Sequence, residues 1–263
     1  MMEIGREAEY RLQKFVSTIY NLIVSRDIHF DLLVCGGNTG LVMAYITERI
    51  YAHVGITPPA KLVLPIYRYY PGFLDDPEHL FDNAHLQSYV EAALDKFPSL
   101  RNVLFVDDEI GLGITASTIL GFLYGWQQSH DSHNGFNYYI VAEDQGFKVE
   151  NRLSGVNINF VPYAYEIEGW NNIIACIVPA KYENPVMQIF PEHILPLHQR
   201  MNILLGLPIK EFANGQPRFS SGFLEKAKET IPNLSLLQKE FRSFLDEKIG
   251  ACCKSLMVEH QSN

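Results

Sequence analysis

The 263-residue chain lacks the features that mark disulfide-stabilised, metal-binding and membrane-spanning proteins. Its four cysteines show neither CxxC spacing nor a disulfide framework, so we expect reduced thiols at Cys35, Cys176, Cys252 and Cys253. The nine histidines include no HExxH or comparable metal spacing. No apolar run approaches the roughly 18 residues that a membrane span requires. The charged beginning MMEIGREAEYRLQKF has no apolar core, so we expect no signal peptide, no membrane partner and a cytoplasmic location.

Basic residues are also few. The 21 lysines and arginines are outnumbered by 30 acidic residues, which gives a net charge of −9. A nucleic-acid partner requires a basic face that neutralises phosphates, so we expect none. No internal repeat or low-complexity tract is visible. With 47% hydrophobic and 19% charged residues, the composition is typical of a globular protein with a large core.

Apolar runs alternate with helical patterns along the first two thirds of the chain. The predicted helices are 7–25, 41–55, 86–97 and 116–130, and the predicted strands are 29–37, 61–70, 102–106, 136–144 and 156–165, with one more at 173–180. The strands are continuously apolar and do not alternate cleanly between apolar and polar residues. This pattern predicts an α/β fold with a mostly parallel twisted sheet and helices on both faces.

The pattern changes after about Pro185. Helices are predicted at 192–206, 221–230 and 234–256, with a loop around 212–221. We therefore expect two parts, an α/β core over 1–184 and a helical C-terminal extension over 185–263. The apolar faces of the extension's helices are expected to pack on the core or on a second copy of the chain in a homodimer.

Two glycine-rich segments follow predicted strands. The first is CGGNTG, residues 35–40, and the second is DDEIGLGIT, residues 107–115. In a parallel sheet, ligands bind beyond the carboxyl ends of the strands, near the point where the strand order reverses. Glycine allows close approach of the backbone to a ligand, and the N–H groups that open a helix attract anions. Phosphate is the natural occupant of such loops.

The adjacent carboxylates of Asp107 and Asp108 suggest a second part of the ligand. Burying either carboxylate without a partner would be costly, so sugar hydroxyls, a cation, or a lysine or arginine must face them. A site that offers amides to a phosphate and carboxylates to nearby hydroxyls is complementary to a sugar phosphate.

The stretch VLFVDDEIGLGIT resembles the signature of type I phosphoribosyltransferases, which is an apolar strand, two acidic residues, a short loop, and Gly-x-Thr at the start of a helix. The resemblance implies that Asp107 and Asp108 face the ribose hydroxyls of phosphoribosyl pyrophosphate. It also implies that the loop binds the 5′-phosphate; the residues concerned are Gly111, Leu112, Gly113, Ile114, Thr115 and Ala116. The expected ligand is therefore a small phosphoribosyl compound or nucleotide.

The same resemblance, which spans about residues 10–180, assigns further roles. It implies that the first glycine-rich segment binds diphosphate and Mg²⁺ through Gly36, Gly37, Asn38 and Thr39. Asp107 and Asp108 are the expected metal ligands. Arg68 could bind diphosphate, Glu109 is the one candidate general base by position, and 69–85 falls where the family has a mobile catalytic loop. Many family members carry a basic residue in the first loop, and this chain has none there.

Four alternatives remain open. The run VLFVDDE also begins two-component receiver domains, although we find no lysine-bearing strand downstream and a receiver has no use for Gly-x-Thr. In a purely structural interpretation, the glycines form turns and Asp107 caps a helix. GGNTG alone could be a plain turn in which Asn38 or Thr39 caps a helix. The chain could also be a non-catalytic sensor that binds a nucleotide or phosphoribosyl pyrophosphate. The acceptor base and the role of 185–263 are not determined by the sequence.

Overall fold

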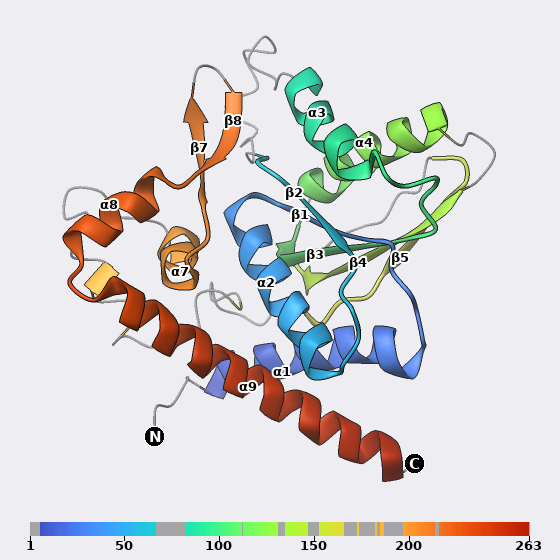
Figure 1. Cartoon of the computed structure of the whole chain (residues 1–263). Helices are drawn as coiled ribbons and strands as arrows, with labels where there is room; N and C mark the ends of the chain where they lie inside the picture. Colours follow the sequence, from blue (N-terminus) through green and yellow to red (C-terminus); the bar gives the residue numbers. More distant parts are fainter. Residues whose placement is uncertain are drawn as a thin grey trace.

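Five parallel strands form the centre of the molecule, in the order β2-β1-β3-β4-β5 (Figure 1). The computed structural model describes residues 6–66, 83–111, 113–130, 135–146, 153–165, 173, 182, 185–186, 197–213 and 216–262. The strands are β1 (Leu32–Gly36), β2 (Ala60–Leu64), β3 (Asn102–Ile110), β4 (Phe136–Asp144) and β5 (Val156–Phe160), and the short β6 (Ala164–Tyr165) pairs with the end of β4. The predicted α/β fold class is confirmed.

The order of the strands reverses between β1 and β3. From β1 the chain moves to β2 on one side, and it then returns to add β3, β4 and β5 on the other side. In open parallel sheets, the loops that follow the two strands at such a reversal diverge and leave space for a ligand. The two glycine-rich segments follow these two strands.

Helices cover both faces of the sheet. They are α1 (Arg6–Tyr20), which continues as the π-helical turn η1 (Asn21–Ser25), then α2 (Gly37–His53), α3 (Asn83–Leu94) and α4 (Ile114–His130). All five residues of β1 are buried. Leu33 and Cys35 belong to the apolar cluster that includes α1 and α2, whereas Leu32 and Val34 belong to the cluster that includes α3 and α4. Burial on both faces explains why the strands are continuously apolar.

The C-terminal segment contains a hairpin that was not predicted from the sequence. Its elements are α7 (Leu197–Leu205), β7 (Ile209–Ala213), β8 (Gln216–Ser220), α8 (Gly222–Thr230) and α9 (Leu234–Ser262). The predicted loop at 212–221 is wrong, because β7 and β8 pair as antiparallel strands over most of it. The dipeptide between them is Asn-Gly, the strongest short signal for a two-residue hairpin turn.

The long helix α9 packs along α1 and α2 (Figure 1). Phe241, Leu245, Ile249 and Cys253 recur every four residues on its buried face, and they share one apolar cluster with residues of α1 and α2. Polar contacts add to this packing. The Asp246 carboxylate lies 2.6 Å from Nε of Arg49 and 3.0 Å from Nε2 of His53, both on α2.

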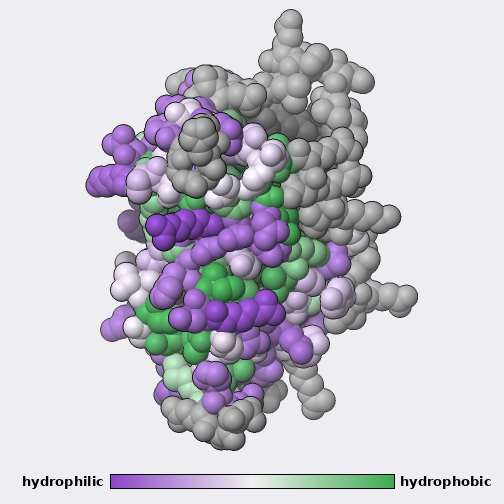
Figure 2. All heavy atoms as spheres, turned by 90° about the vertical axis from the view of Figure 1, so that its right-hand side faces the viewer, coloured by the Kyte–Doolittle hydropathy of each residue, from purple (hydrophilic) through white to green (hydrophobic). Residues whose placement is uncertain are grey.

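The remaining expectations on the fold are only partly covered by the described residues. Cys35, Cys252 and Cys253 are free thiols, as expected. Of the predicted strand 173–180, only Ile173 is described, and it is helical. Figure 2 shows one face of the molecule, on which apolar and polar residues are interleaved. None of the helices in the described part of the chain is long and apolar enough to span a membrane.

Candidate functional site

The strand β1 passes directly into α2. Gly36 is the last residue of β1 and α2 begins at Gly37, so the loop expected over 35–40 is absent, and the helix starts earlier than predicted. Gly37 adopts a φ of +68°, which favours glycine. No side chain caps this helix, which contradicts the interpretation that Asn38 or Thr39 does so. The change of direction is therefore made by backbone conformation alone.

The two glycine-rich segments meet in space. A Cβ atom at Gly36 would lie only 2.5 Å from Cγ2 of Thr115, the second residue of α4. A Cβ atom at Gly40 would lie 2.7 Å from Cβ of Cys35. A side chain at either position would therefore force a neighbouring residue to shift. The contact also joins two segments that are far apart in the sequence.

The acidic residues lie inside β3. The sequence pattern predicted them after a strand that ends at Val106, but β3 continues to Ile110. Val106 pairs with Val141 and Glu109 pairs with Glu143, so Asp107 and Asp108 together oppose one residue of β4. This irregularity has the form of a β-bulge, which bends a strand and changes the direction of its side chains. Bulges are frequent next to active sites.

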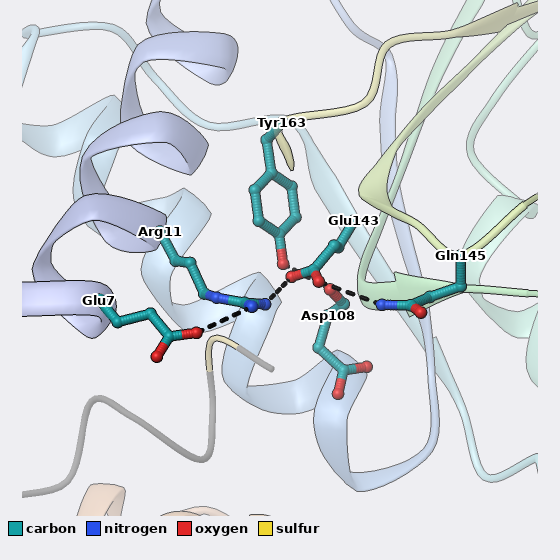
Figure 3. Close-up of polar contacts among 6 residues, drawn as sticks. All are labelled: Glu7, Arg11, Asp108, Glu143, Gln145 and Tyr163. Atoms are coloured by element: carbon teal, nitrogen blue, oxygen red, sulfur yellow. Dashed lines mark hydrogen bonds and ion pairs between the residues drawn. The ribbon is translucent and has the colours of Figure 1, made fainter. Parts of the chain in front are cut away.

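Both carboxylates are nearly inaccessible to solvent. Asp107 is 3% exposed and Asp108 is 2% exposed. Oδ1 of Asp107 accepts hydrogen bonds from the backbone N–H of Asp108 at 3.0 Å and from the Thr39 hydroxyl at 3.3 Å. In Figure 3, the carboxylate of Asp108 points away from Glu143. The structure thus brings together Thr39 and Asp107, two of the predicted site residues, whereas Glu109 is half-buried in the β3–β4 pair.

The start of α4 offers backbone donors beside these acids. Gly113 has a φ of +69°, and its carbonyl accepts the N–H of Ser117 at 2.8 Å. By helix geometry, the N–H groups of Ile114, Thr115 and Ala116 have no intrahelical acceptor. Ile114 is 47% exposed, so this helix start is open to solvent at that residue. Gly111 is half-buried. Two other predicted site residues, Leu112 and Arg68, lie outside the described residues, as does nearly all of the predicted mobile loop at 69–85.

A buried ion pair lies next to the bulge (Figure 3). Arg11 of α1 donates a hydrogen bond to the Glu143 carboxylate at the end of β4, and their side chains are 1% and 2% exposed. Burial raises the pKa of Glu143 above its usual value, and the Arg11 guanidinium opposes this rise. The Tyr163 hydroxyl donates to the carbonyl of Asp108. Nothing in the sequence pattern indicated this group of residues, because its members come from four separate segments.

The second missed feature is a lysine from the C-terminal hairpin. The backbone N–H of Lys210, on β7, donates to Oδ1 of Asn38 at 2.7 Å, and Asn38 is 4% exposed. The Lys210 ammonium donates to the carbonyl of Ile66 at 2.6 Å. It also lies 3.5 Å from the position that a Cβ atom on Gly37 would take. Asn38 and Lys210 are 172 positions apart, so no local pattern could have linked them.

Mg²⁺ was predicted from the sequence with Asp107 and Asp108 as its ligands, and carboxylates offer oxygen atoms only. Within the described part of the chain, no group of three or more His, Cys, Asp or Glu is placed to hold a metal ion. Mg²⁺ is usually bound by one or two carboxylates together with substrate phosphates. The neighbouring carboxylates of Asp107 and Asp108 fit that donor set.

Comparisons with known proteins do not identify a family. No family model and no curated protein sequence matches this chain. Among solved structures, there is a match to a hypothetical protein from Neisseria gonorrhoeae with bound ppGpp, with 10% sequence identity and a TM-score of 0.34. The match covers 65% of this chain and 85% of that chain. A similarity of this size supports no conclusion about function, so the site must be interpreted from its own geometry.

Proposed function

We propose that this chain binds phosphoribosyl pyrophosphate with Mg²⁺ at the carboxyl edge of its sheet, and transfers the phosphoribosyl group to a nitrogen nucleophile. The observation that carries the proposal is the meeting of three features where the strand order reverses. These are the glycine junction of β1 and α2, the buried acids in the bulge of β3, and the open start of α4. Together they offer backbone amides and carboxylates within one small region.

Each part of the ligand has a matching set of groups. The N–H groups that open α4 would bind the 5′-phosphate, with help from the Thr115 hydroxyl. Asp107 and Asp108 would accept hydrogen bonds from the ribose hydroxyls, because a carboxylate has several lone pairs and can take more than one donor. The start of α2 would face the diphosphate. The hydrogen bond from Thr39 to Asp107 holds the diphosphate side and the ribose side of the site together.

The reaction would displace diphosphate from C1 of the ribose through a state with oxocarbenium character. The chain's own contribution is position and charge, since buried carboxylates beside the ring stabilise the positive charge that develops there. Bound Mg²⁺ would supply neutralisation of the leaving diphosphate. Glu109 remains the candidate general base by position, because its half-buried side chain lies next to the acidic pair.

A non-catalytic sensor is the second candidate. One contact favours it, because the start of α2 is bonded to the C-terminal hairpin through Asn38 and Lys210. A ligand that moved the start of α2 would also move β7. The same site would then report binding to the C-terminal segment.

Calorimetry with phosphoribosyl pyrophosphate and Mg²⁺ tests both candidates. Absence of binding would rule out the transferase and a sensor of phosphoribosyl pyrophosphate. Binding accompanied by release of diphosphate in the presence of one member of a panel of nitrogenous bases supports the transferase. Binding without release across the whole panel supports the sensor. A crystal soaked with ribose 5-phosphate would place the 5′-phosphate directly, and the start of α4 is the expected position.

A further inference from the structure

The diphosphate side of the proposed site requires positive charge. Diphosphate is a polyanion, and the first glycine-rich segment contains no lysine or arginine. The buried carboxylates of Asp107 and Asp108 make the neighbourhood more negative. Backbone amides at the start of α2 offer dipoles, but a full charge binds phosphate more strongly. A cation must therefore come from another part of the chain or from a metal ion.

The β7–β8 hairpin carries a lysine to this place. The ammonium of Lys210 lies beside Gly37, at 3.5 Å from the position of a Cβ atom built there, and a longer residue at 37 would meet it. Its hydrogen bond to the carbonyl of Ile66 fixes the ammonium just beyond the end of β2. The ammonium is therefore next to the residue that begins α2, at the carboxyl edge of the sheet.

The hairpin is anchored on both of its strands. On β7, the backbone of Lys210 is bonded to the buried side chain of Asn38 in α2. On β8, the carbonyl of Pro217 lies 3.0 Å from Nε2 of His85 in α3. Two anchors on two different helices keep the lysine in place before any ligand binds. Preorganisation of this kind lowers the entropy cost of binding.

We propose that Lys210 is the diphosphate-binding cation of this site, and that the C-terminal hairpin is therefore part of the ligand site. The inference rests on the proposed function, which it deepens by assigning the basic residue that the first segment lacks. The ammonium would pair with phosphate oxygens, while the amides at the start of α2 would bind the same group from the other side. Ribose 5-phosphate, which has no diphosphate, would not use this lysine.

The test is calorimetry with three probes, namely inorganic diphosphate, phosphoribosyl pyrophosphate and ribose 5-phosphate, each with Mg²⁺. Lys210→Met should weaken the binding of the first two probes by at least about ten-fold, because a hydrogen bond to a charged group is lost. The affinity for ribose 5-phosphate should stay unchanged. Lys210→Arg should recover part of the lost affinity. The matched control is Arg218→Met on the same hairpin, whose guanidinium pairs with Glu211 at 2.8 Å and should not contribute.

The outcomes separate the inference from the proposed function. If Lys210→Met binds diphosphate as tightly as the unchanged chain while ribose 5-phosphate still binds, the inference is overturned and the proposed function stands. If the unchanged chain binds diphosphate through Lys210 but does not bind ribose 5-phosphate, the phosphoribosyl function fails and the cation site stands. No binding of any probe overturns both.

A second measurement covers the case in which Lys210→Met does not fold. Lysine acetylation can be followed by mass spectrometry on the unchanged chain, with and without inorganic diphosphate and Mg²⁺. Diphosphate should slow the acetylation of Lys210 and leave that of Lys226, an exposed residue of α8, unchanged. Equal rates at Lys210 with and without diphosphate would overturn the inference.

Discussion

Asp107 and Asp108 are buried within the bulge of β3. We predict that Asp107→Asn combined with Asp108→Asn weakens the binding of phosphoribosyl pyrophosphate by about ten-fold or more, because charged hydrogen bonds to the ribose and to Mg²⁺ are lost. The melting temperature should stay the same or rise, since an amide is cheaper to bury than a carboxylate and its oxygen can still accept the bonds made to Asp107. Calorimetry and thermal melting measure the two effects. A large fall in melting temperature would assign these carboxylates a structural role instead.

Arg11 and Glu143 form a buried ion pair next to the two aspartates. Arg11→Met should lower the free energy of unfolding by about 3 kcal/mol or more, because Glu143 is left buried beside an apolar side chain. Adding Glu143→Gln should restore much of this loss. Urea unfolding of the single and double variants forms a double-mutant cycle, and strictly additive losses would show that the two residues are not coupled.

The pH dependence of the Arg11→Met variant follows from the direction of the shift at Glu143. Burial raises the pKa of this carboxyl, and removing the guanidinium that opposes the rise must raise it further. A group whose pKa is raised on folding contributes stability below its unfolded pKa and loses it as pH rises through the folded pKa. The destabilisation caused by Arg11→Met should therefore shrink as pH falls below neutral. A loss that is constant with pH would contradict this assignment.

At the scale of single elements, α9 contains a glycine whose role is steric. A Cβ atom on Gly250 would lie 2.7 Å from Cε1 of His53 on α2. In an exposed helix interior, replacing glycine with alanine usually stabilises by about 1 kcal/mol. We predict that Gly250→Ala gives no such gain, because the ring of His53 must move and its contact with Asp246 is disturbed. Thermal or urea unfolding measures the difference.

Two controls isolate this effect. In α4, Cβ atoms on Gly121 and Gly125 would meet no atom within 4 Å, so alanine there should give the usual gain of about 0.5–1 kcal/mol. In a His53→Ala background, Gly250→Ala should also become stabilising. If Gly250→Ala stabilises the chain with His53 in place, the close contact between residue 250 and the His53 ring does not lower the stability of the folded chain.

The sequence predicted most elements because their apolar runs report burial directly. The strand of residues 136–144 was predicted to its last residue, since β4 is covered on both faces. The predicted ends of elements were wrong where an element does not begin or end with a change in burial. The helix α2 starts early because Gly37 turns the chain through its backbone conformation, and β3 extends past Val106 because the bulge keeps charged residues in the sheet. Hydrophobic pattern contains no information on either event.

For the molecule as a whole, the attachment of α9 to α2 should depend on pH. Burial raises the pKa of Asp246, but hydrogen bonds from Arg49 and His53 outweigh burial, so that its pKa lies below the ordinary value of 3.8. A carboxyl with a lowered pKa contributes stability above its unfolded pKa, and this is lost as pH falls through the folded pKa. Asp246→Asn should therefore lower stability near neutral pH, by less than about 1 kcal/mol because the pair is partly exposed.

Urea unfolding at a series of pH values checks this expectation. The unchanged chain and Asp246→Asn should converge in stability as the medium becomes more acidic than the unfolded pKa. A difference that persists in strong acid would mean that Asp246 acts through packing and not through charge.

The candidate site was only partly predictable from the sequence, because some of its residues are far apart along the chain. The motif VLFVDDEIGLGIT is local, so the acids and the start of α4 could be proposed from residue order alone. Lys210 and Arg11 reach the same edge of the sheet from opposite ends of the sequence, and only the folded chain brings them there. Their types and spacings do not distinguish them from ordinary surface cations.

The bond between Asn38 and Lys210 spans 172 positions, and this distance has a consequence for biosynthesis. During translation, the parallel strands and their helices emerge from the ribosome well before β7 does. A nascent chain stalled before residue 210 would contain all the strands of the parallel sheet, yet it would lack Lys210, the proposed diphosphate-binding cation. If Lys210 is the diphosphate-binding cation, the ability to bind diphosphate arises only after β7 has been synthesised.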